Sequence, residues 1–471
     1  MQEEERYFPK DFLEMMQNRL GNEFDAFVRA LNETPPTSIR INPVKGANLF
    51  SDSAQIPWCK YGRFLNERPS YVWDPMYHAG AYYSQEASSM LFANAIDFSK
   101  DLKVLDLCAA PGGKSSLVQS MMTKNSVLVS NEMVGKRVNI LYENLVKWGA
   151  QNAVVTCNRS TDFLPFQGLF DVVLVDAPCS GEGMFRKDEE AVNQWNDGLV
   201  RQCSAIQKTI LDDAIRLVSE NGLLIYSTCT FEAAENEENI AQLYQKYGDI
   251  LEPVDLPNDP SWGLFDVEIN TGKTKNQKGY YCFPHRVKGE GLFLSVMRVK
   301  ASVKGKFTTK NQSVIRKASA KEKEIAKAFS DTSIYGTDVF FHGDKAFLGN
   351  PIYAELYTAL AQNLYLRKVG TTIGQLKNNM LIPDPEIALS GEANPDIPRV
   401  ALNLKEALDF QQRKNIVLPP ETSKGWIIFT YGSVELGWAK NLGNRVNTHY
   451  PSEWRIRKEP TKEFLESKLG F

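Results

Sequence analysis

The strongest constraint on the fold is a run of alternating short apolar strands and helices between residues 103 and 226. Strands are predicted at 104–107, 126–130, 153–156, 171–175 and 223–226, with helices at 115–122, 134–148 and about 200–219. Such alternation indicates a parallel sheet covered by helices on both faces. We therefore predict an α/β, Rossmann-like core, which binds its ligand at the carboxyl ends of the strands.

Different patterns precede and follow this core. Residues 8–32 carry apolar side chains at helical spacing, which predicts two short helices before a strand at 38–43. A further helix is predicted to open at Ser84, which would serve as its N-cap. On the far side, an antiparallel pair of strands within 279–300 is expected to close the core.

The composition changes after Lys300. Eight Lys or Arg residues lie in 301–330 with only Glu322 and Glu324 against them, which predicts either a solvated basic connector or the first helix of a new domain. The rest of the C-terminal third is predicted to contain a helix near 354–362, a Pro-containing break at 383–398, and a hairpin of 425–431 with 434–440 in a small β domain. These patterns divide the chain into residues 1–100, 101–300 and 301–471, and the last part includes a β module at about 399–460.

Composition narrows the class of protein. The chain has 471 residues, 43% hydrophobic and 24% charged, which fits two or three domains. The net charge of −3 argues mildly against a nucleic-acid partner, although local patches matter more than totals. We expect no signal peptide and no membrane segment, because apolar runs are short and the N-terminus is acidic. Seven dispersed cysteines without a C-x-x-C pair, and four scattered histidines, predict a reducing cytoplasmic location and no metal site.

A glycine-rich loop, Cys108-Ala109-Ala110-Pro111-Gly112-Gly113-Lys114, follows the first predicted strand. Its end resembles a P-loop, but the first glycine of that motif is replaced by Cys108 and Pro111 offers no amide donor. The alternative is a nucleoside cofactor at the first strand-to-helix turn, where glycines let the backbone approach the ligand. Glu132, after the second strand, would then bind the ribose hydroxyls, unless it is only a solvated residue at a helix N-terminus.

Two thiols follow the next strands of the predicted sheet. Asp176 and Cys179 come after the fourth strand and Cys229 after the fifth, so we expect all three at one edge of the sheet. Carbon-5 of a pyrimidine is a poor nucleophile and becomes enamine-like only after a thiolate adds to carbon-6. Two cysteines and an acid beside an S-adenosylmethionine pocket suit that chemistry. A buried structural cysteine is the alternative for either thiol taken alone.

Three segments, Leu107–Lys114, Asp176–Lys187 and Ser227–Thr230, resemble signature motifs of the Nop/Sun family of RNA (cytosine-5) methyltransferases. The stretch from Glu182 to Lys187 resembles the bacterial 16S ribosomal RNA branch, RsmF type, and so does the tail from Gly437 to Ile456. Arg40-Ile41-Asn42 matches the N-terminal signature of the family. The resemblance covers nearly the whole chain.

The resemblance implies a class I methyltransferase core with an N-terminal α+β extension that binds RNA and a C-terminal PUA-like β domain. It implies S-adenosylmethionine-dependent methylation of carbon-5 of cytosine in RNA, 16S ribosomal RNA in this branch, through a covalent bond between a cysteine and carbon-6. The partner would be ribosomal RNA or the small ribosomal subunit, and we expect a monomer. A non-catalytic RNA-binding assembly factor and a P-loop NTPase are the rival hypotheses.

The resemblance also implies roles for single residues. Cys229 would attack carbon-6, Cys179 would assist product release, Asp176 would hold N3 and the amino group of cytosine, and Lys114 would position Asp176 or the base. The residues expected to bind the cofactor are Cys108, Ala109, Ala110, Pro111, Gly112, Gly113, Lys114, Glu132, Asn158 and Asp176. Asn158 departs from the family, which often has an acidic residue there to bind the adenine, and it could offer an amide instead.

Overall fold

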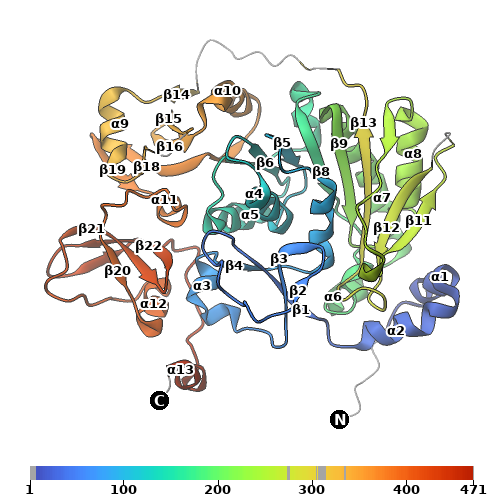
Figure 1. The fold of residues 1–471 in the computed structure, drawn as a ribbon, viewed down its shortest axis with the longest axis horizontal. Helices are drawn as coiled ribbons and strands as arrows, with labels where there is room; N and C mark the ends of the chain where they lie inside the picture. The colour runs from blue at the N-terminus through green and yellow to red at the C-terminus, as the bar shows by residue number, and fades with distance from the viewer. Residues whose placement is uncertain (1–6, 273–275, 304, 306–313, 334–335, 470–471) are drawn as a thin grey trace.

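Four β-sheets organise the chain in the computed structural model, which describes residues 7–272, 276–303, 305, 314–333 and 336–469. A small N-terminal sheet packs beside a large central sheet, and two further sheets follow in the C-terminal third (Figure 1). Within these ranges, every helix is too short or too polar to cross a bilayer.

The N-terminal part begins with the two predicted helices, α1 (Lys10–Leu20) and α2 (Phe24–Asn32). The four strands of its sheet run in the order β2 (Gln55–Ile56), β3 (Cys59–Leu65), β1 (Thr37–Ile41) and β4 (Tyr82–Ser84). The short helix α3 (Pro75–His78) precedes β4.

The prediction that a helix opens at Ser84 is wrong. Ser84 ends β4, because it pairs with Ile39 of β1 and is held extended. A 3-10 helix follows at Ser88–Ala95, and Glu86 rather than Ser84 accepts hydrogen bonds from the backbone N–H groups of Ser88 and Ser89, both at 2.8 Å. Sheet pairing, which the local sequence does not reveal, decided this segment.

The central sheet contains all five predicted strands. Its order is β11-β12-β13-β9-β8-β5-β6-β7-β17, with β10 also paired to β13. The strands are β5 (Lys103–Asp106), β6 (Val127–Asn131), β7 (Ala153–Thr156), β8 (Phe170–Asp176), β9 (Val218–Thr228), β10 (Leu251–Pro253), β11 (Phe265–Ile269), β12 (Gln277–Cys282), β13 (Leu292–Val299) and β17 (Leu366–Val369). β5 to β9 are mutually parallel, and β12 and β13 form the expected antiparallel pair.

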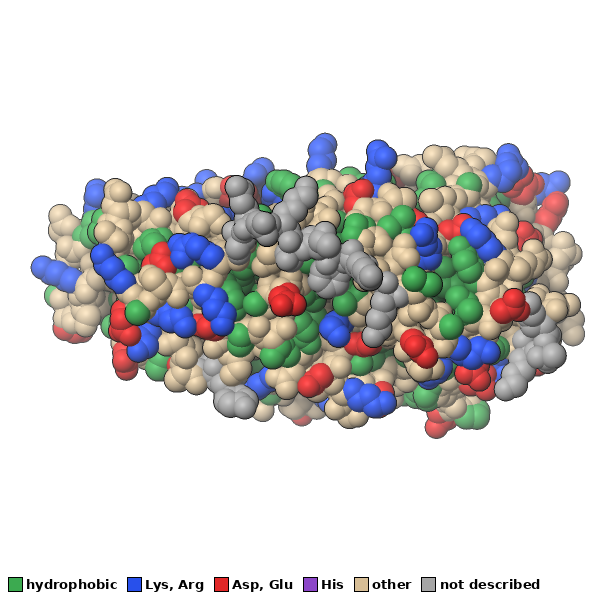
Figure 2. Space-filling model, turned by 90° about the horizontal axis from the view of Figure 1, so that it is seen from above, with side chains coloured by type: hydrophobic (Ala, Val, Ile, Leu, Met, Phe, Trp, Pro, Cys, Tyr) green, Lys and Arg blue, Asp and Glu red, His purple; other side chains and the backbone are tan. Residues whose placement is uncertain are grey.

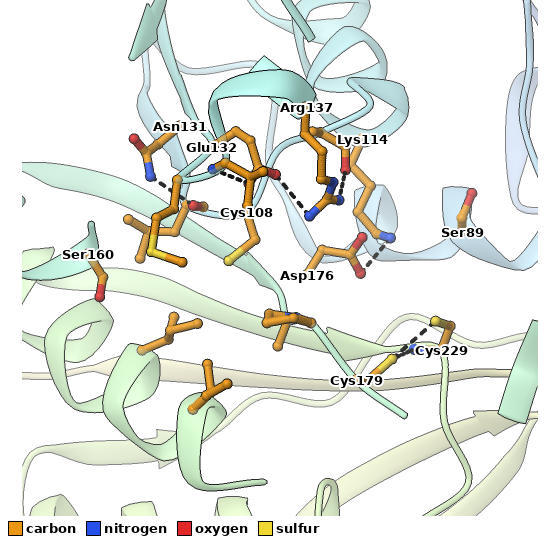
Figure 3. A pocket seen from close by; sticks show the side chains of 18 of the residues that line it. Ser89, Cys108, Lys114, Asn131, Glu132, Arg137, Ser160, Asp176, Cys179 and Cys229 are labelled. Carbon is orange, nitrogen blue, oxygen red and sulfur yellow. Dashed lines mark hydrogen bonds and ion pairs between the residues drawn. The ribbon is translucent and has the colours of Figure 1, made fainter. Parts of the chain in front are cut away.

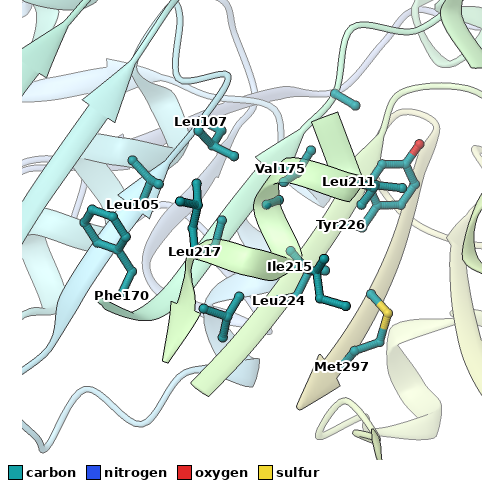
Figure 4. Packing of buried hydrophobic residues seen from close by; sticks show 14 of the residues in the cluster. Leu105, Leu107, Phe170, Val175, Leu211, Ile215, Leu217, Leu224, Tyr226 and Met297 are labelled. Carbon is teal, nitrogen blue, oxygen red and sulfur yellow. The ribbon is translucent and has the colours of Figure 1, made fainter. Parts of the chain in front are cut away.

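Helices cover both faces of this sheet. α4 (Gly113–Met121) and α5 (Gly135–Trp148) lie on one face, while α7 (Asp197–Leu217), α8 (Glu237–Tyr247) and α10 (Ala354–Asn363) cover the other. Neighbouring strand residues alternate between the two cores, so Leu105 packs in the cluster of Figure 4 and Val104 packs on the opposite side. Both are fully buried, which explains the continuous apolar runs of these strands.

The remaining elements lie mainly in the C-terminal third. One sheet has the order β14 (Ile315–Lys317), β15 (Asp338–His342), β16 (Lys345–Gly349), β18 (Thr371–Lys377) and β19 (Met380–Pro383). The other has the order β20 (Arg399–Ala401), β21 (Gly425–Tyr431), β22 (Val434–Asn441) and β23 (Val446–Thr448), and contains the predicted hairpin. The helices not yet placed are α6 (Glu189–Gln194), α9 (Ala320–Lys327), α11 (Pro385–Leu389), α12 (Leu404–Gln411) and α13 (Lys462–Leu469).

The basic segment after Lys300 contains a helix in its described part. α9 begins at a capping box, in which Ser319 and Glu322 bond to each other's backbone N–H groups. Glu322 also pairs with Arg316 at 2.7 Å, and Lys323 pairs with Asp338 at 2.5 Å, so several of these cations are already neutralised. The other basic residues of the predicted connector include Lys304, Lys306 and Lys310, which lie outside the described residues.

The predicted break at 383–398 contains α11. Asp384 caps it by accepting a hydrogen bond from the Glu386 N–H at 3.0 Å, and Pro385 occupies the first helical position. Asp-Pro at a helix start is a recognisable signal that the interpretation as a break overlooked.

We propose that residues 1–100, 101–300 and 301–471 are the functional divisions of the chain, with a PUA-like module at about 399–460. Separate sheets in the three parts support this division. The parts also share structure, since β17 from the C-terminal third pairs with β7 at the edge of the central sheet. Truncation after Lys300 would therefore remove a strand from the core sheet.

Arg40 fixes the N-terminal sheet to the core. Its fully buried guanidinium lies over the Trp148 ring at 4.1 Å and donates to Gln85 at 2.7 Å and to the Ser116 hydroxyl at 2.5 Å. Asn42 donates to the Trp148 carbonyl at 2.8 Å. The Arg40-Ile41-Asn42 signature thus carries the contacts that join this sheet to α4 and α5.

Asp106 at the end of β5 predicts a pH-dependent stability. Burial raises its pKa from 3.8 to about 7, and the Asp176 charge adds to the rise. The unfolded chain releases this proton at lower pH than the folded chain, so Asp106 destabilises the fold increasingly from about pH 4 to pH 7. We expect the free energy of unfolding of Asp106→Asn, relative to that of the natural chain, to increase as the pH rises from about 4 to 7. Above pH 7 this difference should stay constant. Urea unfolding at several pH values measures the difference, and a difference that does not vary with pH would contradict it.

Candidate active site

A cavity of about 680 Å³ opens at the carboxyl edge of the central sheet. The ends of β5, β6, β8 and β9 form its floor, and the strand order reverses at β5, between β6 and β8. Ligand sites in open α/β sheets lie at this kind of reversal. In Figure 3, Glu132, Cys108 and Asn131 lie on one side of Asp176, and Cys179 and Cys229 lie on the other.

Glu132 follows β6 and its side chain is only 4% exposed. One carboxylate oxygen accepts a hydrogen bond from the Val134 N–H at 2.9 Å. The other lies 3.2 Å from Arg137 Nη1 but has no hydrogen-bond partner. A buried acceptor that lines the cavity without such a partner suits the ribose hydroxyls of S-adenosylmethionine, and this observation shows that the residues present fit the cofactor.

The glycine-rich loop contributes unevenly to the cavity. Cys108, Ala110 and Lys114 line it, whereas Ala109, Pro111, Gly112 and Gly113 are not among its lining residues. Gly112 has φ +108° at the start of α4, a conformation that L side chains rarely adopt. Gly112 is therefore required by the backbone conformation at this turn. Cofactor binding by these four residues stays a prediction.

Asn158 lines the cavity, but both ends of its amide already have partners. Its oxygen accepts a hydrogen bond from the Tyr365 N–H at 2.9 Å, and its nitrogen donates to Asp162 at 3.2 Å. Asn158 therefore joins the end of β7 to the segment before β17. Its contact with the adenine stays a prediction.

The two thiols meet at one end of the cavity. The sulfurs of Cys179 and Cys229 are 3.1 Å apart, and both residues are half-buried. The hydrogen bond to Cys229, burial, and the nearby charge of Cys229 all raise the pKa of Cys179 well above 9.0. The backbone N–H of Cys229 donates to the Cys179 sulfur at 3.3 Å and offsets only part of this rise.

Lys114 and Asp176 form an ion pair beside the thiols, with 2.8 Å between Nζ and Oδ1. Ser227 donates its hydroxyl proton to the same Asp176 oxygen at 2.7 Å. Burial alone lowers the pKa of Lys114, but attraction to Asp176 outweighs it and the pKa is raised, so Lys114 stays charged. The ammonium group of Lys114 is paired with Asp176, whereas the lysine of a P-loop binds phosphate. This pairing argues against a P-loop.

Several site residues escaped the sequence analysis. Asn131 donates to the Leu107 carbonyl at 3.1 Å and to the Asn158 carbonyl at 2.9 Å, so one side chain ties together the ends of three strands. Arg137 donates to the Ala110 carbonyl at 2.9 Å and holds the loop beside Glu132. Asn131 directly precedes Glu132, and this position was a usable signal.

The N-terminal extension and the β12–β13 connection also reach the cavity. Glu86 and Ser89 come from the extension, and Glu290 and Gly291 from the connection. Glu86 accepts a hydrogen bond from the Glu290 N–H at 2.8 Å, which joins the two segments. No local sequence signal marks these residues, because their role depends on segments about 200 positions apart.

The apolar wall of the cavity comes from α7 and from the loop after β6. Ile206 and Ile210 lie on α7, and Met133 and Val134 follow Glu132. Met133 is 60% exposed and Ile206 is 41% exposed. Large apolar side chains left open on both sides of a cavity fit a flat, partly apolar ligand group.

The sheet order, the cavity at its reversal and the buried carboxylate after β6 together define an S-adenosylmethionine-dependent methyltransferase of the Rossmann-like class. Three family models match in order: the N-terminal domain of 16S rRNA methyltransferase RsmF at residues 8–87, the 16S rRNA methyltransferase RsmB/F family at 93–298, and the RsmF PUA domain at 398–456. The chain belongs to the RsmB/F family of 16S rRNA methyltransferases and has the domains of its RsmF branch.

Curated relatives match this chain over nearly its whole length. Ribosomal RNA small subunit methyltransferase F of Vibrio parahaemolyticus is 29% identical, over 95% of this chain and 97% of the relative. The protein of that name in Escherichia coli O157:H7 is 28% identical, over 95% and 96%.

Solved structures share the fold. A methyltransferase homologue from Pyrococcus horikoshii superposes with a TM-score of 0.52 and 24% identity, covering 62% of this chain and 95% of the other. NSun6 from Pyrococcus horikoshii with SFG gives a TM-score of 0.52 and 17% identity, covering 63% and 99%.

Cofactor affinity should depend on Glu132. A carboxylate that accepts hydrogen bonds from hydroxyl groups makes charge-assisted bonds of roughly 1.5–3 kcal/mol each. We expect Glu132→Ala to weaken S-adenosylmethionine binding about tenfold or more in calorimetry. Glu220→Ala, an exposed carboxylate at the opposite edge of the sheet, is the control and should bind as the natural chain does. Unchanged affinity in Glu132→Ala would remove Glu132 from the site.

Proposed function

We propose that this protein methylates carbon-5 of cytosine in 16S ribosomal RNA and uses S-adenosylmethionine as the methyl donor. The observation that carries the proposal is the pair of sulfurs 3.1 Å apart beside the Lys114–Asp176 ion pair, in the cavity that also holds Glu132. The family gives the kind of RNA. The paired thiols give the chemistry, because methylation of carbon-5 needs a nucleophile for carbon-6.

The reaction follows from the thiols. The Cys229 thiolate adds to carbon-6, and the electron pair of the 5,6 double bond makes carbon-5 a nucleophile that accepts the methyl group. The bond between carbon-6 and sulfur then breaks as Cys179 gives its proton to the departing Cys229 sulfur. The Cys179 sulfur takes the proton from carbon-5, and the double bond reforms. Cys179, 3.1 Å from the departing sulfur, assists this release. When bound, the cofactor supplies only the electrophilic methyl group.

The electrostatics support this division of labour, which the sequence alone left open. The hydrogen bond to Cys229 and burial both raise the pKa of Cys179, so Cys179 keeps its proton and is a poor nucleophile. The thiolate is the nucleophilic form of cysteine. Cys229 is therefore the better candidate for attack, and Cys179 for the proton transfers that accompany release.

Asp176 and Lys114 would hold the base. Asp176 is 34% exposed and can face cytosine N3 and its amino group, while Lys114 and Ser227 fix the carboxylate from behind. A cytosine stacked in a helix must leave the stack to reach this cavity, at a cost of a few kcal/mol. Contacts between the rest of the protein and the RNA backbone would offset that cost.

The partner is small-subunit ribosomal RNA, as naked RNA or within an assembled subunit. We propose that the protein acts as a monomer, because a single chain already brings Lys114, Asp176, Cys179 and Cys229 together in one cavity. We also propose that it acts in the cytoplasm, which the seven free cysteines support. A non-catalytic assembly factor would not require the four groups Lys114, Asp176, Cys179 and Cys229 to meet in one cavity.

The target can be tested in cells. Bisulfite sequencing of 16S ribosomal RNA from a deletion strain should lose one or more protected cytosines, and the natural gene should restore them. Complementation with Cys229→Ala should leave them unprotected. Unchanged protection in the deletion strain would refute the proposed reaction.

The two thiols should give opposite results when replaced. We expect Cys229→Ala to abolish methylation and to form no covalent complex with RNA. We expect Cys179→Ala to permit attack and methyl transfer but to stall elimination, so that a protein–RNA adduct survives a denaturing gel. An adduct from Cys229→Ala, with none from Cys179→Ala, would reverse the assignment. Cys203→Ala, a buried thiol outside the cavity lining, is the control.

In its described part, the face in Figure 2 carries no region of one charge that would mark it as RNA-binding. On the face in Figure 2, basic and acidic side chains are interspersed. In the PUA-like module, Arg455, Arg457 and Lys458 are exposed close together in the sequence, between Glu453 and Glu459.

RNA affinity should therefore depend on this module. We expect the double variant Arg455→Glu and Arg457→Glu to weaken RNA binding at least tenfold and to reduce the salt slope by about one unit for each lost phosphate contact. S-adenosylmethionine binding should not change. Lys100→Glu, an exposed lysine before β5 at the opposite edge of the core, should bind RNA as the natural chain does. Equal affinity and salt slope in the double variant would place the RNA elsewhere.

A further inference from the structure

The two cysteine loops extend beyond the sheet that carries them. The pairing of β8 with β9 ends at Asp176 opposite Ser227, and each cysteine lies past that point. The residue after each cysteine carries a hydroxyl, and the oxygens of Ser180 and Thr230 are 3.1 Å apart. The loops are therefore joined directly behind the thiols.

Glu182 lies between these two hydroxyls and bonds to both. One carboxylate oxygen lies 2.8 Å from the Ser180 hydroxyl, which also bonds to Glu235, and accepts a hydrogen bond from the Trp195 indole N–H. The other accepts from the Thr230 hydroxyl and from the Phe231 N–H at 3.0 Å. Glu182 is fully buried and is not among the residues that line the cavity.

Neighbouring contacts tie the same loops together. The Gly183 N–H donates to the Cys229 carbonyl at 2.9 Å, so the residue after Glu182 touches the nucleophile's own backbone. A Cβ at Gly183 would lie 2.9 Å from that carbonyl oxygen and 2.5 Å from the Gly291 oxygen, which leaves no room for any other residue. The approach of the two loops is thus close and specific.

We infer that Glu182 is a positioning residue that sets the spacing of the Cys179 and Cys229 thiols by holding Ser180 and Thr230 on one carboxylate. This inference rests on the proposed function for its catalytic consequence, but the spacing itself can be measured without RNA. Glu182 acts through the residues next to the thiols and touches no substrate.

Among side chains of this length, only a carboxylate can accept hydrogen bonds on two separate oxygens, as this position requires. The Trp195 and Phe231 N–H groups can only donate, and each faces a different oxygen of Glu182. Burial raises the pKa of Glu182 to about 8, helped by the charges of Glu232 and Glu235, and a proton on Glu182 could still be donated to one of the hydroxyls. The amide nitrogen of glutamine cannot accept a hydrogen bond from the Trp195 or the Phe231 N–H group. Glu182→Gln therefore keeps the side-chain volume but loses the hydrogen bond to one of these two groups.

The spacing can be measured as a disulfide equilibrium. In mixtures of oxidised and reduced glutathione, two protein thiols and one glutathione disulfide give one protein disulfide and two glutathione thiols. Mass spectrometry of the Cys179–Cys229 peptide pair then gives the effective concentration of one thiol toward the other. We expect Glu182→Gln to lower this equilibrium constant roughly ten- to hundredfold and kcat by a similar factor, with the KM for RNA and S-adenosylmethionine affinity unchanged.

Two variants keep the test decisive. Glu189→Gln changes an exposed carboxylate at the start of α6, away from the Glu182 hydrogen bonds, and it should match the natural chain in both measurements. Thr230→Val removes one hydroxyl and keeps the Phe231 contact, so it should give a smaller loss in both, and it replaces Glu182→Gln if that variant does not fold.

The outcomes separate the inference from the proposed function. Loss of both the disulfide equilibrium and kcat supports the positioning role. If Glu182→Gln changes the disulfide equilibrium but the natural protein does not methylate cytosine, the proposed function is refuted and the spacing role of Glu182 stands. An unchanged equilibrium would overturn the inference, whether or not kcat falls.

Discussion

The parallel pairing of β8 with β9 is the constraint on which the site depends. Its register sets Asp176 opposite Ser227, and therefore brings the chain that continues to Cys179 beside the chain that continues to Cys229. Parallel strands end at the same edge, so two thiols 50 residues apart in the sequence arrive 3.1 Å apart in space. The large apolar interior beneath this pairing, in which Val175, Leu224 and Tyr226 are buried, holds the strands rigid (Figure 4).

Burial and neighbouring charges then set the protonation states of Lys114 and Cys179 at this edge. Lys114 stays charged because Asp176 is 2.8 Å away, while Cys179 keeps its proton because Cys229 and burial raise its pKa. The same cavity thus holds the Lys114–Asp176 ion pair and a Cys179 thiol that keeps its proton beside Cys229. The Glu182 network lies behind this set, away from the ligand, and contributes geometry rather than charge.

The regions outside the core act as supports for the same edge. Arg40 bonds to α4, whose first turn carries Lys114, and Glu86 reaches across to the Glu290 backbone at the rim of the cavity. The C-terminal third adds β17 to the sheet, and Tyr365 next to it binds Asn158. An RNA bound across the N-terminal extension would therefore contact elements that are bonded to α4 and to the rim of the cavity.

The sequence by itself determined the order of strands and helices in the core, the loop from Cys108 to Lys114, and the strand-end placement of Glu132, Asp176, Cys179 and Cys229. Apolar runs, glycines and strand ends are local signals, and the resemblance of three motifs gave the family. Only the tertiary structure decided that Ser84 extends a strand, that Asn158 is bonded at both ends, and that Glu182 joins the two cysteine loops. Each of these depends on at least one partner tens or hundreds of residues away, whose hydrogen bonds form only when the chain has folded.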